Sequence, residues 1–198
     1  YNSLAHRTTW LRSDFDPCRY HVRVTQRKDV SYMRKKAYRT RLHVFLEIAA
    51  WLCLLVSFGI AIYGMNVLPD TIAIHFTLDG AADGYGSPGS LLLMPIIMTL
   101  CVGGISLTAH ILNPEEQFNM PFRVNESNKI LVYRDMCTML FCMNLEIALF
   151  TLYLEIKSFG QNGEGILPVT GIYIALMALT IVGFCLKAYR NNRRGGDD

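Results

Sequence analysis

The side chains best suited to chemistry gather in one short stretch, residues 68–90. This stretch is acidic and contains no Lys or Arg. Carboxylates beside an imidazole and a phenol can attract a metal ion, a cationic peptide or a basic protein surface. The candidate contacts for a ligand or partner are Asp70, His75, Asp79, Asp83 and Tyr85.

The spacing within this stretch does not build a metal site by itself. His75, Asp79 and Asp83 recur every four residues, which would align them on one face of a helix. Gly80 and Gly84 disfavour a helix, and the ligand order of an EF-hand loop is missing. We therefore assign no metal and no cofactor. A peptide or protein contact and a purely structural cap both stay open.

A second set of polar residues lies inside an apolar run. Asn144 and Glu146 are flanked by apolar residues. A charge in mid-membrane costs about 3 kcal/mol on insertion scales, so Glu146 must be protonated, be paired or face a wet cavity. Such a residue is either a functional site or a hydrogen-bonding link between helices. The partners considered for such a link are Ser57, Thr99 and Asn144.

Motifs of catalysis and of nucleic-acid binding are missing from the sequence. There is no H-E-x-x-H or G-x-S-x-G motif, and the glycine-rich residues 84–89 lack the Lys of a phosphate-binding loop. The basic N-terminal segment has neither zinc-finger spacing nor a stacking-aromatic motif. The sequence therefore predicts a protein that is not an enzyme and that binds no nucleic acid.

Four apolar blocks determine the predicted fold. They cover residues 44–64, 91–112, 131–156 and 166–186, in a chain that is 52% hydrophobic. Each block is long enough, as a helix, to cross a hydrocarbon core of ~30 Å. We predict an all-α integral membrane protein with four transmembrane helices in the lipid bilayer. Its parts are a basic segment (1–42), a four-helix membrane domain (43–190) and a tail (191–198).

Small residues recur along two of the predicted helices. In block 44–64 a small residue recurs at every fourth position, and block 166–186 contains a similar series of small residues. Small side chains let helices approach closely in lipid. The predicted packing stripes are Ala49, Cys53, Ser57 and Ala61 in the first block and Gly171, Ala175 and Gly183 in the last.

The distribution of basic residues predicts the orientation in the membrane. Of the nineteen Lys and Arg residues, eleven lie in residues 1–42, none lies in residues 66–90, and only Lys157 lies on that same side. Basic residues stay on the cytoplasmic side. Both termini are therefore expected inside the cell, and residues 68–90 outside.

The basic residues just before the first block have two alternative roles. Each Lys or Arg near an anionic membrane surface contributes about 1 kcal/mol of attraction. The segment therefore contacts anionic lipid or docks a cytoplasmic partner, or it serves only to anchor the topology. The residues concerned are Arg34, Lys35, Lys36, Arg39 and Arg41.

The expected shape of residues 68–90 is an ordered loop. Residues 71–76 alternate polar or small side chains with Ile72, Ile74 and Phe76, which predicts an extended segment with one apolar face. Residues 78–80 and 83–86 are rich in Asp and Gly, which predicts two turns.

The order of these residues resembles a known family. A span ending in Leu68-Pro69-Asp70 is followed by Ile74-His75-Phe76, by Asp79-Gly80 and by Asp83-Gly84-Tyr85-Gly86-Ser87. This order is similar to the N-terminal membrane domain, of unknown function, in the SdpI-type immunity proteins. The resemblance covers about residues 44–112, and the loop that follows, to about residue 130, supports it.

The resemblance implies a bacterial cytoplasmic-membrane protein of the immunity or signal-receptor type. Its implied partners are a secreted peptide or toxin outside the cell and a cytoplasmic regulator inside. Two alternatives stay open from the residues alone. One is an accessory membrane subunit of a larger transporter complex, and the other is a small transporter that uses Glu146.

Overall fold

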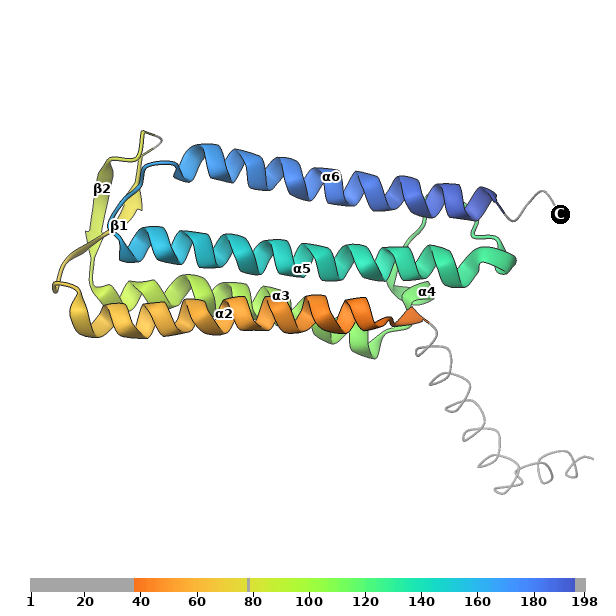
Figure 1. Cartoon of the computed structure of the whole chain (residues 1–198), viewed down its shortest axis with the longest axis horizontal. Helices are drawn as coiled ribbons and strands as arrows, with labels where there is room; N and C mark the ends of the chain where they lie inside the picture. Colours follow the sequence, from red (N-terminus) through yellow and green to blue (C-terminus); the bar gives the residue numbers. More distant parts are fainter. Residues whose placement is uncertain (1–37, 78, 195–198) are drawn as a thin grey trace, which may run out of the picture. The chain divides into compact units, whose positions relative to one another are not determined.

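The four apolar blocks form four long helices in the computed structural model, which describes residues 38–77 and 79–194 (Figure 1). They are α2 (Arg41–Val67), α3 (Leu93–Ile111), α5 (Lys129–Phe159) and α6 (Ile166–Arg193). All four are long and apolar enough to cross a membrane. The predicted fold of four long apolar helices is confirmed in a mostly helical chain, which is a multi-pass membrane protein with four candidate spans.

Local sequence signals explain where the first helix begins and ends. The Thr40 side chain accepts a hydrogen bond from the His43 N–H (3.4 Å), and His43 Nδ1 accepts one from the Thr40 N–H (3.3 Å). These two bonds cap the free N–H groups of the first turn. At the other end Leu68 is extended, as expected before a proline. The helix extends three residues beyond block 44–64 at each end, over residues 41–43 and 65–67.

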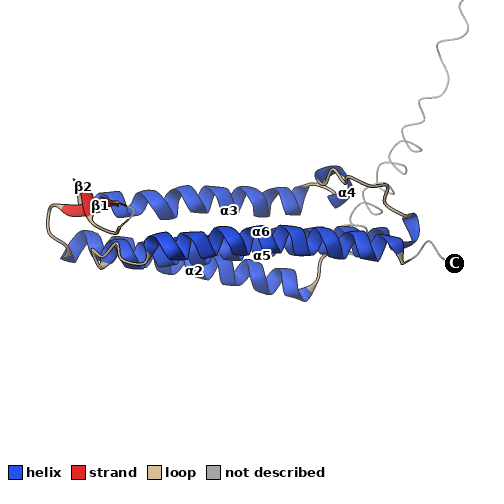
Figure 2. Cartoon of the chain, turned by 90° about the horizontal axis from the view of Figure 1, so that it is seen from above, coloured by secondary structure: helices blue, strands red, loops and turns tan. Residues whose placement is uncertain are grey.

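Helix α5 lies at the centre of the helical arrangement. It packs against α2, α3 and α6 (Figures 1 and 2). The buried residues of α2 are spaced by three or four positions: His43, Leu46, Ala50, Leu54, Ser57, Ala61 and Gly64. The predicted stripe at Ala49, Cys53, Ser57 and Ala61 is only half right. A strict four-residue spacing drifts around a helix of 3.6 residues per turn, whereas alternating threes and fours stay on one face.

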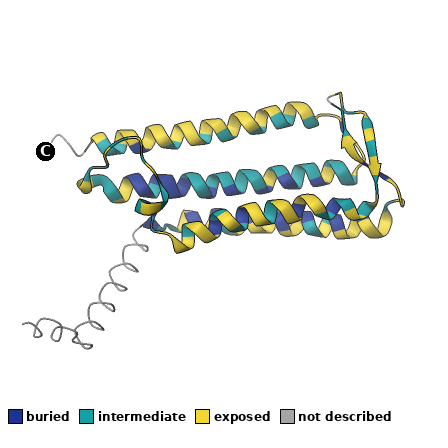
Figure 3. Ribbon diagram, turned by 180° about the vertical axis from the view of Figure 1, so that it is seen from behind, coloured by how far each residue is buried: buried dark blue, intermediate teal, exposed yellow. Residues whose placement is uncertain are grey.

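Helix α6 lies at the edge of this arrangement, and most of its surface is exposed (Figure 3). Among its residues only Ala188 is buried. A Cβ added at Gly171 or Gly183 would meet nothing within 4 Å, so the predicted small-residue packing of this helix is wrong. Aromatic rings take its place: Tyr173 stacks on Phe150 of α5 with 4.1 Å between ring centroids. Large rings hold the two backbones apart, so the glycines have no neighbour.

A β-hairpin joins α2 to α3. Strand β1 (Ile72–Phe76) pairs antiparallel with β2 (Ala82–Gly86), with irregular register around His75. The extended segment predicted at 71–76 is confirmed, but the turn predicted at 83–86 is wrong because these residues form β2. A Cβ at Gly84 would lie 2.8 Å from His75 Cβ, and one at Gly86 would lie 2.8 Å from Ile74 Cδ1. The glycines thus serve close strand pairing rather than a turn.

The hairpin lies across one end of the helices, which we call the hairpin end (Figure 1). Ile72, only 2% exposed, packs against Ala61 of α2 and Leu91 of the 3₁₀ helix η1 (Pro88–Leu92). The Ala73 N–H donates to Gln161 Oε1 in the loop between α5 and α6 (2.6 Å). Apolar burial and a hydrogen bond therefore hold β1 in place, and the loop is ordered as predicted.

The turn of the hairpin meets the α5–α6 loop backbone to backbone. Gly80 has a positive φ of 87°, and a Cβ there would lie 2.9 Å from Gly163 C. A Cβ on Gly163 would lie 2.4 Å from Gly80 O and 2.5 Å from Phe76 Cδ1. Only glycine at both positions lets the two loops approach this closely.

The opposite end, where α2 begins and α6 ends, is the terminal end. The loop between α3 and α5 lies here and contains the short helix α4 (Pro114–Gln117) and the 3₁₀ helix η2 (Glu126–Asn128). Side-chain amides fasten this loop to the end of α6: the Asn125 N–H donates to Asn192 Oδ1 (2.7 Å), and Asn192 Nδ2 donates to the Arg123 carbonyl (2.9 Å).

Substituting Gly163 with Ala will destabilise the protein by about 1–3 kcal/mol, because the new methyl group overlaps Gly80 O and the Phe76 ring. The thermal midpoint of the protein in detergent measures the loss. Gly171→Ala is the matched control, since its methyl group meets nothing and alanine favours the helix. Equal midpoints for the two variants would contradict the described contact between the hairpin and the α5–α6 loop.

Candidate functional site

The hairpin brings some of the predicted contact residues together. His75 Nδ1 lies 2.5 Å from Asp83 Oδ1, across the two strands, and both side chains are largely exposed. Thr77 Oγ1 donates to Asp79 Oδ1 and also to the Ala81 carbonyl (3.0 Å). These bonds fix the positions of two carboxylates on an open surface.

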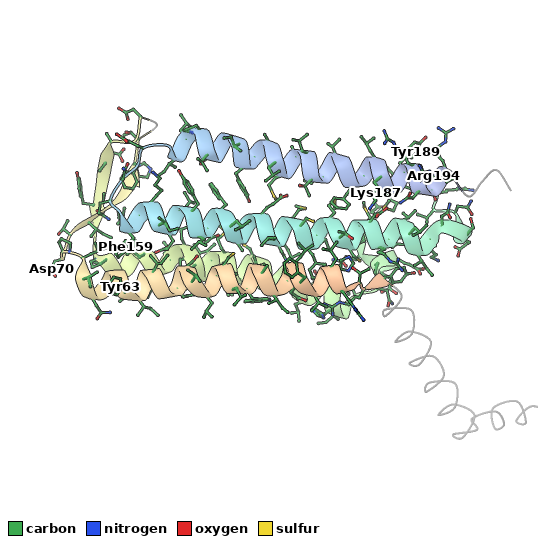
Figure 4. All side chains as sticks on the ribbon, in the orientation of Figure 1. Tyr63, Asp70, Phe159, Lys187, Tyr189 and Arg194 are labelled. Atoms are coloured by element: carbon green, nitrogen blue, oxygen red, sulfur yellow. The ribbon has the colours of Figure 1, made fainter. Side chains whose placement is uncertain are left out.

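Tyr85 and Asp70 complete the set in different ways. Tyr85 lies on β2 opposite Ala73, and 65% of its side chain is exposed. Asp70 lies at the corner between α2 and β1, where Figure 4 labels it. Within the described part of the chain, it shares no hydrogen bond or ion pair with the other four candidates. The candidate surface is therefore the hairpin itself, with Asp70 at its edge.

No metal cluster was found on this surface. In the described residues 38–77 and 79–194, no group of three or more His, Cys, Asp or Glu side chains is placed to hold a metal ion. His75 and Asp83 are satisfied by each other, and Asp79 is satisfied by Thr77. The arrangement suits contacts with a larger cationic molecule better than coordination of an ion.

The charge of Asp79 is stabilised by its surroundings. The Thr77 hydroxyl, and after it backbone N–H groups of the turn, lower the pKa of Asp79 below its usual 3.8. Its carboxylate is thus ionised at neutral pH and available to a cation.

Glu146, the predicted intramembrane candidate, bonds to helix α6. Its Oε1 accepts a hydrogen bond from Thr180 Oγ1 (2.5 Å). The link between helices involves Thr180 rather than Ser57, Thr99 or Asn144. The other oxygen, Oε2, is buried and has no hydrogen-bond partner among the described residues. Sequence reasoning missed Thr180 because no spacing rule indicates which helix faces residue 146.

Asn144 bonds to a different helix. Its side chain is fully buried, and Nδ2 donates to Ser106 Oγ on α3 (3.1 Å). Less than one turn of α5 therefore separates a bond to α3 from a bond to α6. Asn144 and Glu146 lie on different faces of α5 and do not form one site.

Further polar residues of α5 were missed by the sequence analysis. Near the terminal end, Asp135 pairs with Lys187 (2.7 Å) and accepts a hydrogen bond from Asn191 (2.6 Å), both on α6. Thr138 Oγ1 lies 2.8 Å from His43 Nε2 on α2. The sequence contained one signal for the Asp135–Lys187 pair: an acid and a base lie in two apolar helices near the same end of the protein.

Glu155 is the most buried carboxylic acid of the candidate spans, and it was missed as well. Its side chain is 2% exposed and its Oε1 has no hydrogen-bond partner among the described residues. The sequence contains a signal for it: positions 141, 144, 148, 151 and 155 follow the alternating spacing of a buried stripe, and all five are buried. Glu146 lies off that stripe, and it was predicted as a candidate because apolar residues flank it in the sequence.

The predicted basic contacts are only partly described. Arg34, Lys35 and Lys36 lie outside the described residues. Arg39 donates to Glu47 Oε2 (2.9 Å), and Arg41 is exposed. Glu47 also lies 2.8 Å from His110 Nε2. Contact with anionic lipid or a partner stays a prediction for these residues, with Arg41 the freer of the two described.

Comparison with known families places the hairpin in a domain. Residues 52–99 match the family described as "Domain of unknown function (DUF1648)". Residues 52–99 form a DUF1648 domain. The DUF1648 domain comprises most of α2, the whole hairpin, η1 and the first turns of α3. All five hairpin candidates lie inside the domain, whereas Asn144, Glu146 and Glu155 lie outside it. No curated protein and no solved structure matches the chain.

Replacing Thr180 with Val will weaken the packing of α6 on α5 by about 0.5–2 kcal/mol, because Glu146 loses its only hydrogen bond in the described structure. Thermal unfolding in detergent measures this change. Thr170→Val is the matched control, since Thr170 donates to the Ile166 carbonyl of its own helix. If both variants lose the same stability, the bond between the helices contributes nothing.

Replacing Thr77 with Val will raise the pKa of Asp79 towards 3.8, because the carboxylate loses its hydroxyl donor. The carboxyl carbon shift of Asp79, followed by NMR against pH, measures the change. Since folding lowers this pKa, the stabilisation is present above pH 3.8 and is lost as pH falls through the lowered value. Thr71→Val, at an exposed position before β1, is the control and will leave the Asp79 titration unchanged.

Proposed function

We propose that this protein is a bacterial membrane receptor of the immunity or signalling type that binds a secreted cationic peptide on its hairpin. The observation that carries the proposal is the fixed, acidic outer surface of the hairpin. On this surface Asp79 and Asp83 are each held by a hydrogen bond. Tyr85, two residues after Asp83 on β2, is exposed. The resemblance of residues 68–90 to the SdpI-type immunity proteins supports the same role.

The fixed position of the hairpin favours binding. A loop that is already ordered loses little conformational entropy when a ligand arrives. Here Ile72 is buried against α2 and η1, and the Gly80 turn is wedged on Gly163. A loop that served only to connect two spans would not require the glycine pair or the Gln161 bond.

The charges at the hairpin end favour a cationic partner. Asp70, Asp79, Asp83 and Glu164 are all exposed there, and the Lys157 ammonium lies over the Tyr153 ring, 6.0 Å from its centroid. A surface of one sign attracts molecules of the opposite sign and accelerates their encounter. An exposed tyrosine beside carboxylates adds the aromatic contact that is common at the centre of binding surfaces.

The orientation expected from the basic residues agrees with this role. The excess of Lys and Arg in residues 1–42 and after residue 186 favours a cytoplasmic location for both termini. The hairpin then faces outwards, where a secreted peptide arrives. The basic residues Arg39 and Arg41 face the cytoplasm in this arrangement, next to any regulator that responds to binding.

A small transporter is the second candidate function. The observation that favours it is the buried Oε2 of Glu146, which has no hydrogen-bond partner in the described part of the chain. The bond from Thr180 to the other oxygen gives Glu146 a structural role that explains its presence equally well.

Replacing both Asp79 and Asp83 with Asn will weaken binding of a cationic peptide by about tenfold or more, because two charges are lost from the contact surface. Asn keeps the acceptor oxygens for Thr77 and His75, so the hairpin stays folded. The probe is a labelled amphipathic Lys/Leu peptide, and the full chain is held in nanodiscs of zwitterionic lipid. Fluorescence anisotropy measures the dissociation constant.

The control removes two charges from the terminal end, by Glu116→Gln and Glu126→Gln. Amide side chains keep acceptor oxygens for Asn113 and Lys129 at these positions. Unchanged binding by this control is expected. The proposed function is refuted if both double variants bind equally well, or if the wild type binds no more peptide than empty nanodiscs.

A further inference from the structure

Glu155 is the last polar residue on the buried stripe of α5. The stripe faces α2 and α3: Ala148 packs with Leu54 and Val102, and Phe141 stacks on His43 with 5.1 Å between ring centroids. Glu155 lies two turns beyond Ala148 on this same face. Its side chain is 2% exposed, and its Oε1 has no hydrogen-bond partner in the described structure. A carboxyl group is therefore almost completely buried at this position.

The register of the helices shows that Glu155 lies beneath the hairpin. One turn further along α5, the Phe159 ring stacks on Tyr63 (5.9 Å between centroids) and lies against Gly64. Glu155 is therefore level with Ala61, one turn earlier in α2. Ala61 packs with Ile72 of β1 and Leu91 of η1. The hairpin thus covers the end of the core in which the carboxyl lies.

Two hydroxyl groups at the neighbouring level already use their protons within their own helices. Thr151, one turn before Glu155, donates its proton to the Ile147 carbonyl (2.8 Å), and Ser57 of α2 donates to the Cys53 carbonyl (3.0 Å). Both oxygens are fully buried. Thr99 Oγ1 of α3, level with Thr151 by the register of the Asn144–Ser106 bond, is buried and has no hydrogen-bond partner among the described residues. The Thr151 and Ser57 hydroxyls therefore have no proton left to donate to a carboxylate.

No fixed cation neutralises Glu155 in the described part of the chain, since no ion pair reaches it. The titratable side chains at this end are all engaged elsewhere or exposed. On α2 and β1 they are Tyr63, exposed and stacked on Phe159, and His75, paired with Asp83; on α5 and α6 they are Lys157, over Tyr153, and Tyr173, stacked on Phe150. The described residues of η1 and the adjoining turns of α3 contain none.

We propose that Glu155 is a proton-binding site, whose carboxyl holds a proton in the folded protein and is sealed beneath the hairpin. A bare carboxylate in this position would be a buried charge without a counter-ion, which membrane proteins avoid. Binding a proton removes the charge and turns the carboxyl into a hydrogen-bond donor. Release leaves a carboxylate behind and passes the proton to water at the hairpin end, which requires the cover over Ala61 to open. The site is independent of what the hairpin binds.

Infrared spectroscopy of the full chain in nanodiscs tests the site directly. At neutral pH the wild type will show the C=O absorption of a protonated carboxylic acid, and Glu155→Gln will lose that component entirely. Gln copies the shape and neutrality of the protonated acid, so the variant is expected to fold. Glu164→Gln, the same substitution on the exposed α5–α6 loop, will retain the component. Each spectrum is recorded with and without Na⁺, the other small cation that oxygen lone pairs could hold.

An acid component that is lost only in Glu155→Gln, with or without Na⁺, supports the proton site. The proposal is overturned if Glu155→Gln leaves the spectrum unchanged, or if the component emerges only after Na⁺ is removed, which would make this a Na⁺ site. Should Glu155→Gln fail to fold, Glu146→Gln labelled with ¹³C at its glutamate carboxyls replaces it. A protonated glutamate signal that persists there supports the site, and its absence overturns it.

Discussion

The structure depends on the polar side chains of one helix that must find hydrogen-bond partners in an apolar surrounding. Along α5, Thr138 bonds to α2, Asn144 to α3, and Glu146 and Asp135 to α6. Leaving any of these groups unpaired in a membrane costs several kcal/mol. Apolar packing alone would allow the outer helices to slide or rotate around α5. The polar bonds select one register for each, and α5 thereby orders its three neighbours.

The hairpin depends on a different constraint, which is the room available between closely packed backbones and side chains. Two glycines of β2 make room for His75 and Ile74, and two more, Gly80 and Gly163, let separate loops touch. None of these contacts has the energy of a buried salt bridge, but each excludes any larger residue. The hairpin is consequently held by shape and by the burial of Ile72, and its charged residues remain free to face solvent. Structure and candidate binding surface thus use different residues of the same DUF1648 domain.

The sequence predicted the parts of this protein that depend on local rules. The length of the apolar blocks predicted four helices, and the alternation of side chains in residues 71–76 predicted β1. Each of these signals lies within a single segment. The sequence did not predict features that depend on a contact with a distant segment of the chain. The Asp83–Gly86 run has turn composition but pairs as a strand, since the glycines fit beneath the side chains of β1. Thr180 could not be foreseen as the partner of Glu146, and Glu155 was overlooked because its stripe becomes visible only when its buried neighbours are counted.

The attachment of α6 has a mechanical consequence. This helix of 28 residues is about 42 Å long at 1.5 Å per residue, which exceeds the hydrocarbon thickness of ~30 Å. A bilayer accommodates such a length by tilting the helix, and the tilt changes with lipid thickness. Polar bonds join α6 to α5 at Thr180 and Lys187, both in the second half of α6, whereas the first half is held by the stacking of Tyr173 on Phe150. A change of tilt therefore moves the first half more than the second. The first half leads back to Gly163 and the Gly80 turn, which couples bilayer thickness to the position of the hairpin.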